Sequence, residues 1–379
     1  MTLLIALVGT ILARPPNASA QTYRKDSLED PVPVASPLLV PFPAKPWGQA
    51  TQIVGKKPRF RPGEIKDKAL NFDRLPLYND FCLVSDAAGH WHCIAYYMER
   101  TSANSYRDDR LIHYVADSLQ GPYHSVGYVD LGYGEGTGVW APCVLREKDR
   151  VLMFYARAPY QEQSAFEFIR NFSIRVAVAR DAQLQTWQRP DTGMGILFTE
   201  PAARDPEVIR DQNTGQYLLY YVSLKNANYK DASESQETVV RVRTSKDLFS
   251  WSEPLTVLGT PPGYLGAESV FVLEKKGFYY MWISGAGDYS RMSLYISMDP
   301  FNFGDSVGNR IEEQSGHACE IIQTEGQYWM ACVAIASIPG WFSQHDLEGV
   351  YLQPLEWRAA TPEMLAKVVR GSALQRAAP

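Results

Sequence analysis

The chain has 379 residues, of which 45% are hydrophobic and 12% aromatic, enough to bury the core of one large all-β domain or of two ordinary domains. Its formal net charge of -5 argues against a nucleic-acid ligand, because phosphate backbones are bound by a strong basic excess or a basic stripe. The expected partner is therefore small or neutral. The 22 Tyr and 9 Trp suit either stacking on sugar rings or the core of an all-β protein.

The N-terminal segment predicts export. It opens with an apolar run, MTLLIALVGTILA, that is too short to cross a bilayer, and Ala18-Ser19-Ala20 follows as an A-x-A cleavage pattern. We therefore expect residues 1–20 to be a signal peptide and the protein to be secreted or periplasmic. No later run of about 18 apolar residues occurs, so no membrane span is expected.

Residues 21–70 are rich in proline and lack clear periodicity. This composition predicts an N-terminal extension that wraps the following domain or helps to close it, and not a separate domain.

A hairpin pattern recurs five times between residues 71 and 358. Each copy has an apolar strand, a turn rich in Asp, Gly or Lys, and a second strand ending in aromatic residues. The copies begin at Phe81, Pro142, Glu207, Ser269 and Glu320. After four of them comes a further strand, an Asp-containing turn and an edge segment, beginning at Val115, Val178, Thr244 and Ile296. Roughly four strands per repeat, at a period of about 50 to 65 residues, predict a five-bladed β-propeller.

Residues 359–379 are predicted to form a short C-terminal helix and tail. Thr361-Pro362 has the residue types of a helix N-cap followed by proline at the first helical position.

The five cysteines leave the disulfide state open. They are Cys82, Cys93, Cys143, Cys319 and Cys332, without a CxxC pair or a zinc-like Cys/His spacing. A two-residue hairpin at Glu325-Gly326 would place Cys319 directly opposite Cys332. Cys82 and Cys93 flank another turn with the same approximate symmetry. Either a disulfide or two buried thiols would suit these pairs.

The residues ahead of each repeat carry the candidate chemistry, because the inner strands of a propeller begin near one end of its channel. They are Asn79-Asp80, Trp140-Ala141-Pro142, Arg204-Asp205-Pro206, Ala267-Glu268-Ser269 and His317-Ala318-Cys319. Glycosidic cleavage needs one carboxylic acid and one carboxylate, and a third carboxylate can orient them and raise the pKa of the acid. Asp80, Asp205 and Glu268 can fill these three roles.

This set resembles the five-bladed propeller glycoside hydrolases of families 43 and 32, whose first, third and fourth blades supply Asp, Asp and Glu. The resemblance covers about residues 72 to 357. It implies that Asp80 is the general base or nucleophile, Asp205 the orienting carboxylate and Glu268 the general acid. His317 resembles a fifth-blade histidine that lies near a bound cation or water. The sequence VWAP at residues 139–142 resembles the second-blade motif of family 43.

The resemblance is divided between the two families. Asn79-Asp80 and Arg204-Asp205-Pro206 are similar to family 32, yet the Pro-Asn-Gly of that family does not follow Asp80. Family 32 members usually add a C-terminal β-sandwich that this chain is too short to hold, which favours family 43. Ser269-Val270 departs from the Gly-Pro common in family 43, and this departure leaves the sugar open.

The sequence thus predicts an inverting glycoside hydrolase that removes a terminal arabinosyl- or xylosyl-type unit. The alternatives are a retaining β-fructofuranosidase and a non-catalytic carbohydrate-binding propeller. The expected substrate-binding residues are Asn79, Trp140, Arg204, His317 and Trp341. No cofactor or catalytic metal is expected, although the channel near His317 could hold a structural cation or water. We expect a monomer whose only partner is a carbohydrate.

Overall fold

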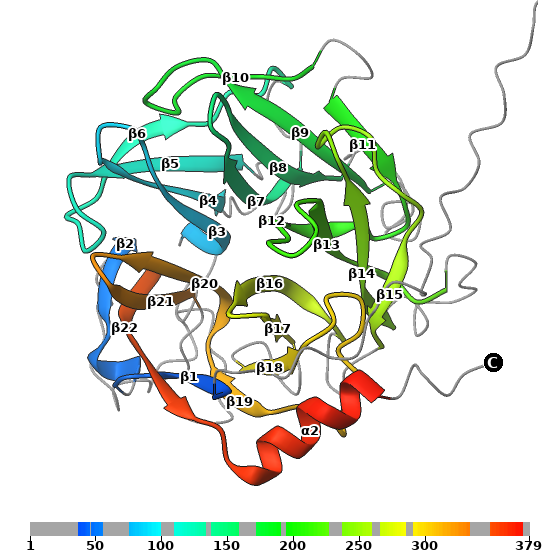
Figure 1. Ribbon diagram of the computed structural model, residues 1–379. Coiled ribbons are helices and arrows are strands. Elements are labelled where there is room, and N and C mark those ends of the chain that lie inside the picture. The colour runs from blue at the N-terminus through cyan, green and yellow to red at the C-terminus, as the bar shows by residue number, and fades with distance from the viewer. Residues whose placement is uncertain are drawn as a thin grey trace, which may run out of the picture. The chain divides into compact units, whose positions relative to one another are not determined.

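The computed structural model describes residues 37–45, 47–55, 76–99, 110–133, 138–158, 172–190, 195–226, 237–259, 266–285, 291–333 and 349–373. All of these ranges belong to one compact unit, Pro37–Pro379 (Figure 1). The predicted signal peptide, Trp341 and much of the proline-rich segment lie outside the described residues.

Five antiparallel sheets surround a central axis, which confirms the predicted all-β, five-bladed propeller (Figure 1). Blade 1 contains β3 (Pro76–Ser85), β4 (Trp91–Glu99), β5 (Arg110–Ala116) and β6 (His124–Tyr128). Blade 2 contains β7 (Val139–Arg146), β8 (Val151–Arg157), β9 (Ser173–Ala179) and β10 (Trp187–Gln188), with β11 (Ile196–Thr199) also paired to β9. Blade 3 contains β12 (Arg204–Arg210), β13 (Tyr217–Leu224), β14 (Thr238–Ser245) and β15 (Leu255–Leu258). Blade 4 contains β16 (Glu268–Lys275), β17 (Phe278–Ser284), β18 (Arg291–Ser297) and β19 (Glu312–Ser315).

Blade 5 is assembled from both ends of the described chain. Its strands β20 (His317–Thr324), β21 (Gln327–Val333) and β22 (Gly349–Ala359) are completed by β1 (Leu39–Pro43), and β2 (Thr51–Gly55) pairs with another part of β22. The short helix η2 (Trp47–Gln49) lies between β1 and β2 in the chain. The ring is therefore closed by backbone hydrogen bonds between its first and last strands.

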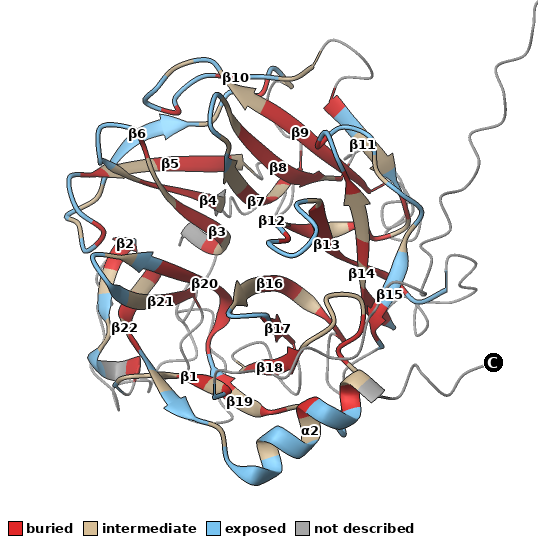
Figure 2. Ribbon diagram, viewed as in Figure 1, coloured by how far each residue is buried: buried red, intermediate tan, exposed pale blue. Residues whose placement is uncertain are grey.

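The core fills the spaces between neighbouring blades, so the middle strands are buried on both faces (Figure 2). Strands β13 and β17 are buried at every position, and their sequences YLLYYVSL and FYYMWIS are almost continuously apolar, as expected for strands without a solvent face. The outermost strand of blade 1, β6, is exposed along its whole length.

Tight two-residue turns connect the first two strands of blades 4 and 5. Lys276-Gly277 and Glu325-Gly326 have positive φ at both positions, between 52° and 78°, as type I′ hairpin turns require. The predicted hairpin at Glu325-Gly326 is therefore present.

The predicted opposition of Cys319 and Cys332 is wrong, although their hairpin is present. A bulge between His317 and Glu320 shifts the register of β20, so Ala318 and Cys319 together face Cys332 and Cys319 has no regular one-to-one partner. On blade 1, Cys93 pairs with Leu83 and not with Cys82. All five cysteines are buried free thiols.

The C-terminal helix α2 (Pro362–Ala373) packs on blade 4 (Figure 1). The Thr361 hydroxyl accepts a hydrogen bond from the Met364 amide at 3.2 Å, which is the N-cap expected from the Thr-Pro pattern. The Asn302 side chain donates to the carbonyl of Gly371 at 2.8 Å and anchors the last turn. Among the described residues, no helix is long and apolar enough to cross a membrane.

Candidate active site

Each of the five inner strands has a β-bulge at the same place, near the end of the channel where these strands begin. We call this end of the channel the mouth. In each strand two residues interrupt the register with the second strand. The interruptions lie between Tyr78 and Phe81, Trp140 and Cys143, Arg204 and Glu207, Glu268 and Phe271, and His317 and Glu320. Four of the five bulges hold a non-glycine residue at positive φ, namely Ala141 (48°), Asp205 (55°), Ser269 (47°) and Ala318 (49°). Such a backbone costs about 1–3 kcal/mol per residue and is typically found at functional sites.

The bulge explains how neighbouring side chains reach the same site. Successive residues of a regular strand point to opposite faces, and a bulge re-aims one of them. Arg204 and Asp205 are adjacent in β12, yet both contact blade 4: the Arg204 guanidinium lies 3.3 Å from the Glu268 carboxylate, and Asp205 accepts a hydrogen bond from the Ser269 amide. Glu268 stands just before its bulge, Asp205 is the first bulge residue of its strand and Asp80 the second of its own.

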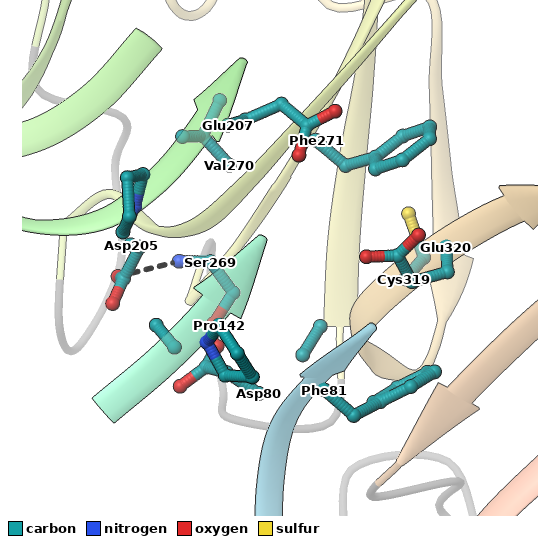
Figure 3. Close-up of a pocket in the computed structure, with 13 residues that line it drawn as sticks. Asp80, Phe81, Pro142, Asp205, Glu207, Ser269, Val270, Phe271, Cys319 and Glu320 are labelled. Carbon is teal, nitrogen blue, oxygen red and sulfur yellow. Dashed lines mark hydrogen bonds between the residues drawn. The ribbon is translucent and has the colours of Figure 1, made fainter. Parts of the chain in front are cut away.

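Ser269 joins three of the channel residues (Figure 3). Its hydroxyl donates a hydrogen bond to Oδ1 of Asp80, and its amide donates to Oδ2 of Asp205 at 2.8 Å. Its oxygen also lies 3.1 Å from Nε2 of the fully buried His317. Because the single hydroxyl proton is given to Asp80, Nε2 of His317 is the donor in this last contact.

Arg204 contacts the other two predicted catalytic carboxylates. Its Nε lies 3.5 Å from Oδ2 of Asp205, and its Nη2 lies 3.3 Å from Oε1 of Glu268. The guanidinium also donates to the carbonyl oxygens of Ala202 and Ala267, which fixes its plane. One guanidinium beside one buried and two half-buried carboxyl groups leaves an excess of negative charge unless protons are bound.

The carboxyl groups consequently hold protons more strongly than exposed ones do. Burial raises the pKa of Glu268 to about 7, although the nearby Arg204 charge opposes the rise. Burial and the Asp205 charge raise the pKa of Asp80 to about 8, the Glu268 charge adds to this rise, and the hydrogen bond from Ser269 opposes it. Asp80 therefore ionises most readily while Glu268 still holds its proton. Burial also raises the pKa of Asp205, against the Arg204 charge. Glu268 can therefore still carry a proton near neutral pH, as a general acid must.

The pocket that Asp80 and Asp205 line also contains two further carboxyl groups, Glu207 and Glu320 (Figure 3). It has an empty volume of about 310 Å³, part of it open to solvent. Glu207 follows the bulge of β12 and Glu320 that of β20, where the other inner strands carry Phe81, Cys143 and Phe271. The sequence reasoning missed both. The signal was available, because each is the first residue of its hairpin repeat and interrupts an otherwise apolar position.

These deeper carboxyl groups should make folding stability depend on pH. Burial raises the pKa of Glu207 to about 8, and burial together with Glu207 raises the pKa of Glu320 far above its usual value. A carboxyl group whose folded-state pKa is raised binds more protons in the folded than in the unfolded state. The free energy of unfolding should thus fall as pH rises from about 4.5 to about 8.

We expect Glu207→Gln to flatten this dependence, because glutamine needs no proton to be buried neutral. Its melting temperature should exceed that of the wild type by several degrees at pH 8 and by much less at pH 5, measured by circular dichroism. The exposed Glu356, paired with Arg358 on the surface, provides the control substitution Glu356→Gln, which should leave the slope unchanged. Parallel wild-type and Glu207→Gln curves would contradict the assignment.

The predicted substrate-binding residues fall into two groups. Arg204 contacts Glu268 directly, and His317 contacts the Ser269 hydroxyl that donates to Asp80. Asn79 lies in the bulge of β3, and Trp140 lies just before the bulge of β7, with its ring edge-on to two neighbouring aromatic rings. Trp341 lies outside the described residues.

The predicted cation or water near His317 stays a prediction. Nε2 of His317 is engaged by the Ser269 hydroxyl, and within the described ranges no three His, Cys, Asp or Glu side chains are arranged to ligate one ion. The mechanism proposed below uses no metal ion.

No family model matches the sequence. The fold is similar to that of a thermostable family-43 glycoside hydrolase, with a TM-score of 0.55 and 15% identity over 76% of this chain and 95% of the other. It is also similar to CoXyl43, a GH43 β-xylosidase/α-arabinofuranosidase from a compost microbial metagenome, with a TM-score of 0.54 and 15% identity over 76% of this chain and 94% of that protein.

A third similar structure is the GH32 β-fructofuranosidase BmSUC1 of Bombyx mori. It has a TM-score of 0.52 and 16% identity, over 75% of this chain and 60% of the silkworm protein. The predicted resemblance to propeller glycoside hydrolases of families 43 and 32 is thereby confirmed in the fold that this chain shares with them.

Proposed function

We propose that the protein is a glycoside hydrolase that removes a terminal arabinosyl- or xylosyl-type unit from a glycan with inversion at the anomeric carbon. The observation that carries this proposal is the single hydrogen-bonded unit in which Ser269 and Arg204 hold Asp80, Asp205 and Glu268 at the channel mouth. Carbohydrate cleavage by the similar family-43 structures supports the substrate class.

In this mechanism Glu268 is the general acid. Its proton passes to the glycosidic oxygen as the bond between that oxygen and the anomeric carbon breaks. Burial raises the pKa of Glu268 to about 7, so the group holds its proton below that pH. The Arg204 guanidinium stabilises the carboxylate that remains after the transfer.

Asp80 is the general base on the opposite side of the sugar. It takes a proton from a water molecule while the water oxygen bonds to the anomeric carbon. The Ser269 hydroxyl stabilises the ionised form of Asp80. Asp205 orients Arg204 and Ser269, and its negative charge raises the pKa of Glu268. After turnover Asp80 holds a proton from the attacking water and Glu268 has given its proton to the leaving group, and exchange with solvent restores both groups.

A retaining β-fructofuranosidase is the second candidate. It is supported by the Asn79-Asp80 and Arg204-Asp205-Pro206 sequences and by the similarity to the Bombyx mori fructofuranosidase. In that reaction Asp80 would attack the anomeric carbon itself, and water would hydrolyse the resulting glycosyl-enzyme.

The stereochemistry of the first product tests the proposal. We expect hydrolysis of 4-nitrophenyl α-L-arabinofuranoside or β-D-xylopyranoside, with the product of opposite anomeric configuration seen first by proton NMR. Net retention, or release of fructose from sucrose or inulin, would replace the proposal by the fructofuranosidase. Sugar binding without release from any of these substrates would leave only the carbohydrate-binding propeller.

We also propose that the protein is exported and acts as a monomer without a cofactor. The apolar N-terminal run and the Ala18-Ser19-Ala20 pattern support export. N-terminal sequencing of the protein recovered outside the cytoplasm should begin near residue 21, and an uncleaved Met1 would contradict the signal peptide.

A further inference from the structure

Three arginines at blade 2 surround the ring of one tyrosine, Tyr133. The Cζ atoms of Arg157, Arg175 and Arg189 lie 4.3, 5.6 and 4.2 Å from the centre of the Tyr133 ring. We call these three residues the arginine cluster. Arg175 is 7% exposed, and the other two are partly exposed and so accessible to a ligand.

The hydrogen bonds of the arginine cluster go to neutral oxygens. Arg175 donates from Nε to the Ser173 hydroxyl at 2.9 Å and from Nη1 to the Tyr133 hydroxyl at 3.2 Å. Arg189 donates to a backbone carbonyl at 3.2 Å, and Nε of Arg157 is buried with no hydrogen-bond partner. Within the described ranges, none of the three forms an ion pair with a carboxylate.

A comparable pair of arginines on blade 3 has a carboxylate partner that offsets part of its charge. Arg241 and Arg243 both pair with Glu200, which also accepts hydrogen bonds from Tyr221 and Ser223. The two sites therefore differ in charge: on blade 3 one carboxylate offsets part of the charge of two arginines, whereas no described carboxylate pairs with any of the three arginines of the cluster.

The positive excess is unfavourable unless an anion offsets it. Burial and the neighbouring Arg175 charge lower the pKa of Arg157, and Arg189 lowers it further. Contact with an aromatic face contributes about 0.5–2 kcal/mol per cation but supplies no counter-charge. Guanidinium groups are planar forks that match the oxygens of a carboxylate or sulfate and bind them by charge-assisted hydrogen bonds.

Strand pairing places the arginine cluster on the mouth side of the propeller. Arg157 pairs with Val139, the residue before Trp140, and Trp140 has the same position in its strand as Glu268 has in blade 4. Tyr155, which hydrogen-bonds to Tyr133, packs against the core shared by blades 1 and 2. The cluster thus borders blade 1, the blade that supplies Asp80.

We propose that the arginine cluster is a subsite for an anionic substituent of the glycan, either the carboxylate of a uronic acid or a sulfate ester. The glycan context rests on the function proposed above, whereas the binding of an anion by the cluster does not. The substrate would then be an acidic polysaccharide fragment whose charged group lies beside the sugar that is cleaved.

Direct binding tests this proposal with the full chain. The probes are D-galacturonate, galactose 6-sulfate, neutral D-galactose and inorganic sulfate, titrated by calorimetry at low and high ionic strength. At low salt we expect at least one acidic sugar to bind about tenfold or more tightly than galactose, the contribution of one charge-assisted hydrogen bond. Salt should weaken this preference.

Substitutions assign the preference to the arginine cluster. Arg157→Gln and Arg189→Gln should lower the affinity for the acidic sugar about tenfold and leave that for galactose unchanged. Arg157→Lys keeps the charge but lacks the forked guanidinium, so its affinity for the acidic sugar should lie between those of the glutamine variants and that of the wild type. Arg358→Gln is the matched control, since Arg358 also covers an aromatic ring, that of Phe42 at 5.1 Å, on another blade.

The possible outcomes separate this proposal from the proposed function. Equal affinity for acidic and neutral sugars in the wild type, or inorganic sulfate binding as tightly as the acidic sugars, would overturn the glycan subsite. Salt-dependent binding of an acidic sugar by a protein that cleaves no glycoside would overturn the hydrolase and keep the anion site.

Discussion

Asp80→Asn should lower kcat by about 10²–10⁴-fold on every glycoside that the wild type cleaves, because an amide cannot accept the proton of the attacking water as the Asp80 carboxylate does in the proposed mechanism. The loss should be the same for good and poor leaving groups, since the base acts on the water and not on the departing oxygen. Steady-state kinetics on a nitrophenyl glycoside and on an oligosaccharide would measure it. The folded state should not suffer, because the burial that raises the pKa of Asp80 makes a neutral side chain easier to accommodate.

Ser269→Ala provides the graded comparison for Asp80. It keeps the carboxylate but removes the hydroxyl that donates to Asp80 and accepts from His317. We expect a smaller loss of kcat than in Asp80→Asn, with an acidic limb of the pH profile that moves upward, because a lost hydrogen bond to the ionised form raises the pKa of Asp80. Wild-type activity in Asp80→Asn would remove Asp80 from the mechanism, whatever the effect of Ser269→Ala.

Glu268→Gln should lose activity selectively, by about 10²–10⁴-fold on glycosides with poor leaving groups and much less on activated aryl glycosides. A nitrophenolate can depart without being protonated, whereas the oxygen of a sugar leaving group needs a proton. A series of aryl glycosides of graded phenol pKa would show this as a steeper dependence of kcat/KM on leaving group in the variant. Equal losses across the series would contradict the role of Glu268 as acid.

The pH profile supplies the control for Glu268. In the wild type the alkaline limb should fall near the Glu268 pKa of about 7, since activity disappears when the acid ionises. Glu268→Gln should abolish that limb. Asp205→Asn should move the alkaline limb to lower pH, because the lost negative charge no longer raises the pKa of Glu268. Arg204 would then pair with Glu268 and no longer with Asp205, which lowers the pKa of Glu268 further.

The number of blades and the place of the carboxyl groups could be predicted from local sequence. A hairpin repeat is a local pattern, since the turn residues such as Glu325-Gly326 and the apolar strands beside them determine it within about fifteen residues. Positions ahead of each inner strand then had to converge, because every blade of a propeller begins at the channel. This reasoning led to Asp80, Asp205 and Glu268.

The tertiary structure alone decided how these groups are held. The bulge at each inner strand, with positive φ at Ala141, Asp205, Ser269 and Ala318, depends on register between strands and leaves no mark in residue type. The same bulge displaced Cys319 from the place expected opposite Cys332. Ser269 was noted only as a departure from a family motif, yet its hydroxyl reaches Asp80, 189 positions away in the chain.

The grouping of the remaining titratable side chains was likewise decided by the tertiary structure. Glu207 and Glu320 share a pocket only because blades 3 and 5 face the same channel, and the arginine cluster forms only where the segment after blade 1 places Tyr133 beside blade 2. Charge interactions depend on distance in space and on burial, neither of which is encoded by spacing along the chain. Local pattern thus determined the fold and the identity of the carboxyl groups, and three-dimensional proximity determined their protonation, their partners and the charge around them.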